Sequence, residues 1–292
     1  MSPDTFVVVL VSGLSGAALL FLVGSGLTLV FGALRIINLA HGSLYMLGAF
    51  LAVALIGAIG GVLGFAAGIV LASLAVGVLG GLIELAILRR LYQREHLMQL
   101  VATFSLILII SGAVRVIFGA NFKRVSAPDF LTGSIPVGGS SISAYQIFLI
   151  AVALAVVVGL YALLYRTGLG RNIRAAVADP ELLQLAGVNV PLLFTTVFVI
   201  GALLAGLGGA VIAPYHAVSL GIDVDIVVQA FAVTIIGGLG SLVGAAIGSI
   251  LVGLVQSFGI YAAPKFSLAF IFIVLAVVLG VRPWGLFGEP ER

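Results

Sequence analysis

The chain has 292 residues, of which 62% are hydrophobic and 8% are charged, with a formal net charge of +3. Its mean hydropathy is +1.36. A soluble protein carries about 25% charged residues, so this chain has too few to cover a water-facing surface. The excess apolar surface must face lipid, which indicates an all-α polytopic membrane protein. The small dispersed charge points to membrane topology rather than to a nucleic-acid partner.

Cysteine is absent, which excludes disulfides, thiolate nucleophiles and cysteine-ligated metal centres. The two lysines, Lys123 and Lys265, do not follow glycine, so the chain lacks the Gly-Lys-Ser/Thr of a phosphate-binding Walker A loop. If ATP drives this protein, another polypeptide binds the ATP. The first residues contain no basic stretch, and a cleaved secretory signal is therefore not expected.

A helix needs about 20 apolar residues to cross a bilayer. Eight hydrophobic segments of this kind follow one another along the chain, near 6–33, 39–58, 62–88, 99–118, 145–165, 192–213, 226–258 and 266–281. The 226–258 segment is too long for one straight helix. We interpret it as a broken or re-entrant helix, because Gly237-Gly238-Leu239-Gly240-Ser241 interrupts it and glycines mark bends.

Cytoplasmic loops collect lysine and arginine. Three loops with such residues fall on one side if the N-terminus is outside: Arg35, then Arg89, Arg90 and Arg94, then Arg166, Arg171 and Arg174. The other side then carries charges of both signs: Asp4, Asp223, Asp225, Lys123 and Arg124. Arg282 and Arg292 favour a C-terminus inside, which requires the 226–258 region to double back.

Polar residues interrupt the apolar sequence at the start of the second segment. Asn38, His41 and Tyr45 are three and four residues apart, a spacing that places them on one helical face. Polar groups within a span normally face the bundle interior or a water-filled path, so we expect these three near a translocation path. Asn38 is alternatively the N-cap of the helix 39–58. For His41, hydrogen bonding or path lining is favoured over metal binding or proton transfer, because no carboxylate or second histidine is near in sequence.

Two other features imitate enzyme sites. Gly13-Leu14-Ser15-Gly16 resembles the serine motif of intramembrane proteases, and Glu84 lies within the third segment. Small residues let helices approach closely in lipid, which explains the first motif and the glycines at every fourth position, such as Gly60, Gly64, Gly68 and Gly240, Gly244, Gly248. Glu84 precedes Arg89 and Arg90 and is expected to form an interfacial ion pair or to extend its carboxylate to the membrane surface.

The loop 166–191 is the longest polar insertion on the predicted cytoplasmic side. Asp179 suits an N-cap, Pro180 the first helical position, and Gly187 the left-handed residue that ends a helix. Glu181 in the first turn complements the helix dipole. These signals predict a short capped helix over 180–186.

That helix would expose apolar side chains in a polar loop. Leu182, Leu183 and Leu185 need a cover, which is either the membrane domain or a soluble partner. The basic flank formed by Arg171 and Arg174 favours a partner.

A family resemblance follows from these motifs in their order. The stretch from Arg174-Ala175-Ala176 through Leu185-Ala186-Gly187-Val188-Asn189-Val190 resembles the coupling loop of ABC importer permeases, which docks on the ATPase. Three further motifs are Asn38-Leu39-Ala40-His41-Gly42, the Gly237–Ser241 break, and Arg282-Pro283-Trp284-Gly285-Leu286-Phe287-Gly288. Together they make the whole chain similar to the permease subunit of branched-chain amino-acid (LIV-type) ABC importers.

The resemblance implies one transmembrane permease domain over 1–292, with 166–191 as its cytoplasmic coupling loop, in the bacterial inner membrane. It implies a second related permease, two ATP-binding subunits and an extracytoplasmic substrate-binding protein as partners, and neither enzymatic activity nor a cofactor or metal. The cargo would be a branched-chain amino acid or a related small solute, such as urea, amides or aromatic acids. The residues expected to contact the ATPase are Arg171, Arg174, Asp179, Pro180, Glu181 and Gly187. Those expected near the path are Asn38, His41, Tyr45, Gly237, Gly238, Gly240 and Ser241.

Two other functions remain open from the residues alone. A self-contained secondary transporter or channel is compatible with a broken helix and an intramembrane histidine, although it would normally need an intramembrane carboxylate or ion site, which the sequence hardly offers. An intramembrane hydrolase would depend on Ser15.

Overall fold

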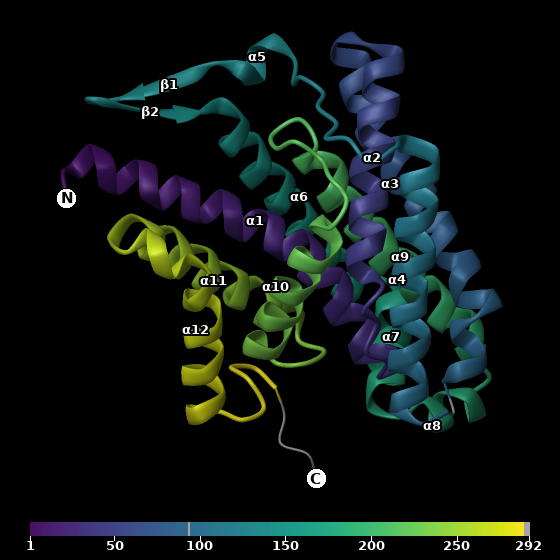
Figure 1. Ribbon diagram of the computed structural model, residues 1–292. Coiled ribbons are helices and arrows are strands. Elements are labelled where there is room, and N and C mark those ends of the chain that lie inside the picture. Colours follow the sequence, from purple (N-terminus) through teal and green to yellow (C-terminus); the bar gives the residue numbers. More distant parts are fainter. Residues whose placement is uncertain (93, 289–292) are drawn as a thin grey trace.

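The computed structural model describes residues 1–92 and 94–288 and is almost entirely α-helical (Figure 1). In this part of the chain, seven helices are long and apolar enough to cross a membrane: α1 (Pro3–Leu34), α2 (His41–Ile59), α3 (Gly61–Ala86), α4 (His96–Phe118), α6 (Ala144–Arg166), α9 (Val190–Ile212) and α11 (Leu242–Ala262).

Shorter elements connect or complete these spans. They are α5 (Asp129–Thr132), α7 (Gly168–Ala178), α8 (Pro180–Leu185), α10 (Ile222–Gly237), α12 (Ser267–Val281), the 3-10 turns η1 (Leu88–Leu91) and η2 (Pro264–Phe266), and a two-stranded antiparallel hairpin of β1 (Ser134–Val137) and β2 (Ser140–Ser143). The all-α membrane bundle predicted from composition is confirmed, while the hairpin was not predicted.

Helix α1 lies at the centre of the bundle and contacts α6, α9, α10 and α11. Its residues from Leu20 to Val30 are buried on every face, as expected for a helix that is hydrophobic all round. Small residues bring its neighbours close: Gly13 packs on Gly253 of α11, and Gly26 packs on Gly201 of α9. The prediction that glycines mediate helix packing, rather than forming a serine site at Gly13–Gly16, agrees with these contacts.

The predicted break in the 226–258 segment is confirmed. Helix α10 ends at Gly237 and α11 begins at Leu242, and Gly238 and Gly240 between them have φ values of +100° and +85°, which L-residues rarely adopt. Ser241 caps α11 by accepting a hydrogen bond from the Gly244 N–H at 3.0 Å. With 16 residues, α10 is about 24 Å long, shorter than the hydrocarbon core of about 30 Å.

A second discontinuity lies between α1 and α2. The segment 35–40 turns back from the end of α1, and Arg35 ends that helix with a φ of +54°. His41, the first residue of α2, lies beside Val23, about three turns before the end of α1. Helix α2 therefore starts inside the bundle and not at its surface.

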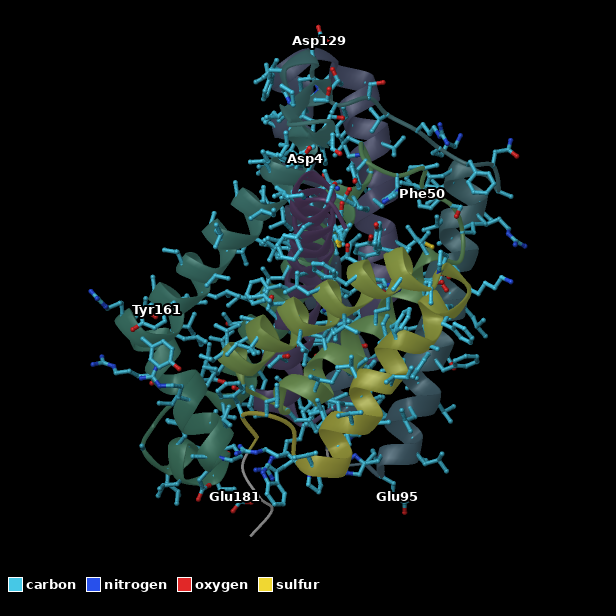
Figure 2. All side chains as sticks on the ribbon, turned by 90° about the vertical axis from the view of Figure 1, so that its left-hand side faces the viewer. Asp4, Phe50, Glu95, Asp129, Tyr161 and Glu181 are labelled. Atoms are coloured by element: carbon cyan, nitrogen blue, oxygen red, sulfur yellow. The ribbon has the colours of Figure 1, made fainter. Side chains whose placement is uncertain are left out.

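The two ends of the bundle differ in charge. The three predicted basic loops are brought to one end, where Figure 2 also places Glu95 and Glu181. We name this the basic end. The opposite end holds Asp129 and the β1–β2 hairpin, and there Asp4 near the N-terminus accepts a hydrogen bond from the Gly139 N–H at 2.9 Å. We name this the hairpin end.

The last described residues return to the basic end. After α12 the Leu286 N–H donates to Ile236 O and the Phe287 N–H donates to Gly237 O, at 2.9 and 3.0 Å. The chain thus doubles back through α10, α11 and α12, as the placement of Arg282 required. Arg292, used in the same prediction, lies outside the described residues.

Candidate translocation path and coupling surface

The coupling segment consists of α7 and α8 at the basic end. Helix α7 begins at Gly168, and Thr167 caps it by accepting a hydrogen bond from the Gly170 N–H at 3.0 Å. Its buried face, Gly170, Ile173 and Ala176, packs against the end of α6. Arg174 donates to the carbonyl of Leu164, and its guanidinium lies 4.9 Å from the ring centre of Tyr165. Thus α7 is attached firmly to the spanning helix before it.

Helix α8 has the predicted caps. Asp179 Oδ1 accepts hydrogen bonds from the Glu181 and Leu182 N–H groups at 3.0 and 2.9 Å, Pro180 is the first helical residue, and Gly187 has a φ of +86°. None of the α8 residues is buried. The exposed fractions of Leu182 and Leu185 are 64% and 85%, so the membrane domain does not cover these two leucines, whereas Leu183 is partly buried against it.

Arg171, Asp179 and Glu181 are exposed on the same segment, and Arg174 is exposed while its head group is engaged with α6. The predicted coupling residues are therefore brought together on one surface at the basic end. We name the exposed set Arg171, Glu181, Leu182 and Leu185 the coupling surface.

A cavity of about 260 Å³ joins this segment to the glycine break. Its lining includes Ile173, Arg174 and Val177 of α7, Thr28 and Gly32 of α1, and Gly240, Ser241 and Leu242 after α10. Residues predicted separately for coupling and for the path thus share one cavity wall. Gly237 and Gly238 do not line it. Gly237 packs so closely on Gly244 that an added Cβ would lie 2.3 Å from the Gly244 carbonyl carbon.

The polar residues at the start of α2 do not lie where the spacing predicted. Asn38 precedes the helix, whose N-cap position is Ala40, so the prediction of Asn38 as N-cap is wrong. Its side chain is fully buried, and neither amide atom has a hydrogen-bond partner among the described residues. His41 and Tyr45 share a buried face, with His41 Nε2 3.1 Å from Val23 O of α1 and Tyr45 against Gly208 of α9.

One functional candidate was missed by the sequence interpretation. Asp223 was assigned to the outer surface, but it is 3% exposed and its Oδ2 accepts hydrogen bonds from Ser43 of α2 and Ser111 of α4, both at 3.0 Å. Ser111 lies about four turns after the start of α4 and two turns before its end, so the carboxylate lies at membrane depth. Asp225, half a turn further along α10, is exposed. We name Asp223, Ser43 and Ser111 the Asp223 cluster.

The signal for this cluster was present but weak. Two aspartates at the edge of an apolar segment are typical of the membrane surface, and the sequence was interpreted in this way. The structure differs because α10 begins inside the bundle, which places Asp223 there. Ionisable groups inside a membrane are costly and commonly mark a substrate or ion pathway.

Glu84 forms the expected ion pair, with its Oε1 3.4 Å from Arg89 Nε. It is fully buried, and Thr195 Oγ1 donates to Glu84 Oε2 at 2.8 Å while Tyr92 donates to Oε1. Burial and the neighbouring Glu84 raise the pKa of Tyr92 above its ordinary value. Arg89 also donates to Pro191 O at 3.1 Å. The interactions of Glu84 and Arg89 therefore connect the end of α3 to the start of α9, directly after the coupling segment.

The comparisons with known proteins cover nearly the whole chain. The profile of a family described as branched-chain amino acid transport system / permease component matches residues 9–279. The high-affinity branched-chain amino acid transport system permease protein BraD of Pseudomonas aeruginosa is 31% identical over 97% of this chain and 95% of its own length. LivH of Escherichia coli is 28% identical over 92% and 91%, and the probable permease LivH of Methanocaldococcus jannaschii is 26% identical over 92% and 89%. No solved structure matches.

Proposed function

Because the chain belongs to the family of branched-chain amino acid transport system permease components, we propose that it is the membrane subunit of an ABC importer powered by ATPases on separate polypeptides. It is a multi-pass membrane protein with seven candidate spans among its described residues. The sequence holds no Walker A motif, which is consistent with ATP hydrolysis elsewhere.

The distribution of charge sets the orientation of the protein in the membrane. Since cytoplasmic loops are rich in lysine and arginine, the basic end faces the cytoplasm and the hairpin end faces outward. The ATPases then meet the coupling surface, and a substrate-binding protein delivers cargo to the hairpin end. The membrane is the bacterial plasma membrane.

The single observation that carries the proposal is that α8 is a capped short helix whose leucines are exposed. A helix of six residues is not stable alone in water, yet this one is capped at both ends while Leu182 and Leu185 remain exposed. An exposed apolar ridge held in fixed geometry on a polar loop is a docking feature. Arg171 and Glu181 beside it would set the orientation of the partner.

Movement of the docked segment would reach the path through the cavity shared by α7 and the glycine break. Arg174 is bound to the end of α6 and lines the same cavity as Gly240 and Ser241. We place the path along α10, the glycine break and the buried, unpartnered Asn38, with His41 and Tyr45 holding α2 against α1 and α9.

A second permease subunit would cover the open face of α10. Val224 and Val228 are 53% and 43% exposed, and Asp225 between them is exposed as well. A carboxylate at this depth is costly against lipid, which favours a protein or water-filled boundary. The matched family is described by branched-chain amino acid transport, and we propose such an amino acid as the cargo of this chain, in preference to urea, amides or aromatic acids.

The coupling proposal is tested by Leu185→Ser in the full complex. Removing the ridge leucine should weaken attachment of the ATPase about tenfold, the effect of losing about 1.4 kcal/mol at an interface. ATP-dependent leucine uptake should fall with it. Leu97→Ser is the matched control, because Leu97 is 68% exposed at the same end but outside the coupling surface. Unchanged attachment and uptake in Leu185→Ser would contradict the proposal.

One observation favours a second candidate function, a self-contained secondary transporter. Such proteins use intramembrane carboxylates, and Asp223 is one. Leucine uptake by the purified chain alone in liposomes, driven by a proton or sodium gradient and abolished in Asp223→Asn, would favour this candidate. Uptake that needs separate ATPases and ATP would dismiss it.

A further inference from the structure

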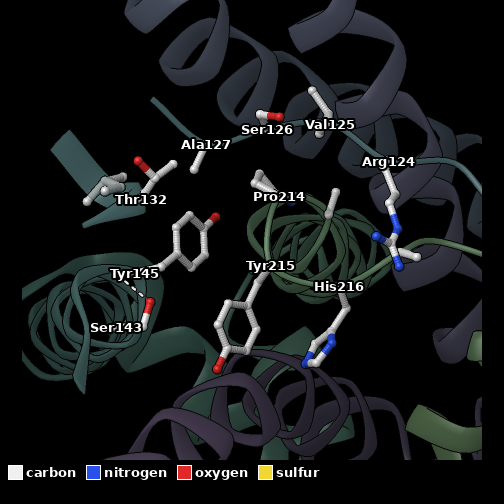
Figure 3. Close-up of a pocket in the computed structure, with 13 residues that line it drawn as sticks. Arg124, Val125, Ser126, Ala127, Thr132, Ser143, Tyr145, Pro214, Tyr215 and His216 are labelled. Atoms are coloured by element: carbon white, nitrogen blue, oxygen red, sulfur yellow. Dashed lines mark hydrogen bonds between the residues drawn. The ribbon is translucent and has the colours of Figure 1, made fainter. Parts of the chain in front are cut away.

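A second cavity, of about 470 Å³, lies at the hairpin end, on the side opposite the coupling surface. Three stretches of chain line it, namely 124–127 with Leu131 and Thr132, the start of α6, and 213–217 after α9 (Figure 3). Binding sites for small molecules are commonly of about 300–1,000 Å³, so the space is sufficient for an amino acid. We name it the outer cavity.

One side of the outer cavity is a fixed aromatic wall. Tyr145 and Tyr215 are stacked, with ring centres 5.6 Å apart and planes 9° apart. The Tyr145 hydroxyl donates to Val211 O at 2.7 Å, which holds its ring in place. Leu131 is buried beside them. Tyr145 is 3% exposed and is itself packed against Phe148, so it supports Tyr215, which is the partly exposed ring of the pair. A ring held in this way offers an aliphatic side chain dispersion contacts without the entropic cost of ordering a flexible group.

The charge in the cavity is positive. Arg124 is exposed, and the structure shows no ion pair for it among the described residues, where Glu84–Arg89 is the pair within 4 Å. The lining contains no aspartate or glutamate. Desolvation lowers the pKa of His216 below its ordinary value, so this imidazole is neutral at neutral pH and Arg124 supplies the charge.

Hydroxyl groups complete the lining. In Figure 3, Arg124 and His216 lie at one side of the lining, with Thr132, Ser143 and Tyr145 at the other. The hydroxyl of Ser126, two residues after Arg124, is an available acceptor for the ammonium group that an amino acid carries on the same carbon as its carboxylate. A cation, a hydroxyl acceptor and an aromatic wall together complement a small apolar amino acid.

One loop connects the lining of the outer cavity to α10, which lines the proposed path. The strand-like contact between Lys123 and Val218, with both N–O distances at 2.8 Å, fastens the 119–128 segment to the 213–221 loop. That loop leads directly into α10 and the Asp223 cluster.

We propose that the outer cavity is a loading site for a branched-chain amino acid, whose carboxylate binds Arg124 and whose aliphatic side chain packs on Tyr215, the ring that Tyr145 supports. The inference rests on the proposed function, since it gives the importer a binding site of its own on the outward side. Because an anionic lipid headgroup would satisfy the same cation, the experiment includes lipid composition as a variable.

The test uses the natural absence of cysteine. Ser126→Cys introduces one thiol in the cavity lining, and Ser134→Cys on β1 is the matched exposed control outside it. The full chain is placed in phosphatidylcholine nanodiscs, and the labelling rate by a charged thiol reagent is measured with and without L-leucine. Thr132→Cys, on the opposite side of the lining, supplies the same measurement if the first thiol reacts too slowly.

Leucine should slow labelling of Ser126→Cys about fivefold at a concentration about four times its Kd, by simple mass action, and leave Ser134→Cys unchanged. 4-Methylpentanoate, which keeps the carboxylate, should also protect, whereas isoamylamine, which lacks it, should not. Adding Arg124→Gln should abolish protection, measured as the ratio of the rates without and with leucine, because removal of this nearby cation by itself changes the reactivity of the thiol.

Two results would overturn the inference. One is no protection by leucine of either cavity thiol. The other is slow labelling in phosphatidylglycerol nanodiscs with no effect of leucine in phosphatidylcholine, which would assign the cavity to lipid. The assay needs neither ATPase nor ATP, so its failure is distinguishable from a failure of ATPase coupling in Leu185→Ser.

Discussion

Helices α8 and α10 are both short, but they are held in place by opposite means. Helix α8 is defined by its own termini: Asp179 caps the start, Gly187 ends the helix, and no residue between them is buried. Helix α10 has no side-chain cap and packs against α1, α2, α11 and α12, with only the face of Val224 and Val228 left open. Local chemistry positions the first and tertiary packing positions the second.

This difference agrees with the roles proposed for them. A surface that docks a separate ATPase has to remain exposed, so its stability must come from within the segment. A helix that lines a path has to pack against its neighbours, because movement of those neighbours is what would open or close the path. Substitutions should therefore act globally in α10 and its contacts, and only locally in α8.

The largest effect is expected where α2 meets α10. A Cβ on Gly42 would lie 2.1 Å from Asp223 O, which the backbone cannot accommodate without moving. Gly42→Val should destabilise the protein by about 3 kcal/mol or more, at the upper end of overpacking effects. Thermal unfolding in detergent, followed by loss of the monodisperse peak, measures this.

Gly57 in the same helix is the matched control, since an added Cβ there meets nothing within 4 Å. Gly57→Val should change stability by less than about 0.5 kcal/mol. Equal tolerance of the two substitutions would mean that α10 does not pack on α2 as described, and the contrast between α10 and α8 would be lost.

A smaller loss is expected at the Asp223 cluster. Asp223→Ala removes the acceptor shared by Ser43 and Ser111, and leaving buried hydroxyls without a partner costs about 1–3 kcal/mol. Asp223→Asn keeps a carbonyl oxygen and should cost less. Asp225→Ala is the control, because Asp225 is exposed and should change the unfolding temperature little. If Asp223→Ala and Asp225→Ala behaved alike, the cluster would not be a structural contact.

The sequence predicts the features that depend on local chemistry, as in α8, and misses those that depend on tertiary packing, as in α10. The helix 180–186, its caps and the glycine break were predictable because each depends on residues within a few positions of one another. The ion pair of Glu84 with Arg89 was predictable for the same reason. The Asp223 cluster joins residues 43, 111 and 223, and no local pattern signals that α10 begins inside the bundle.

Asn38 shows how a local rule fails. Its type and position suit an N-cap, but the segment 35–40 turns back beside α1, and α2 starts later, at His41. The outer cavity was not predicted either, because its lining comes from three stretches that meet only in the folded chain. The predictions that remain untested are those of the path and coupling residues as functional groups.

The smallest effect on the whole protein is expected at the cap of α8. Asp179→Ala removes the acceptor of the Glu181 and Leu182 N–H groups, which costs the helix about 1 kcal/mol. Hydrogen exchange of these two amides should then rise about fivefold, while the unfolding temperature stays constant because α8 buries none of its residues. Gln184→Ala, an exposed position in the same helix, should leave the exchange rates as they are. A drop in global stability in Asp179→Ala would show that α8 is supported by the bundle after all, and ATPase docking would then no longer be needed to explain its exposed leucines.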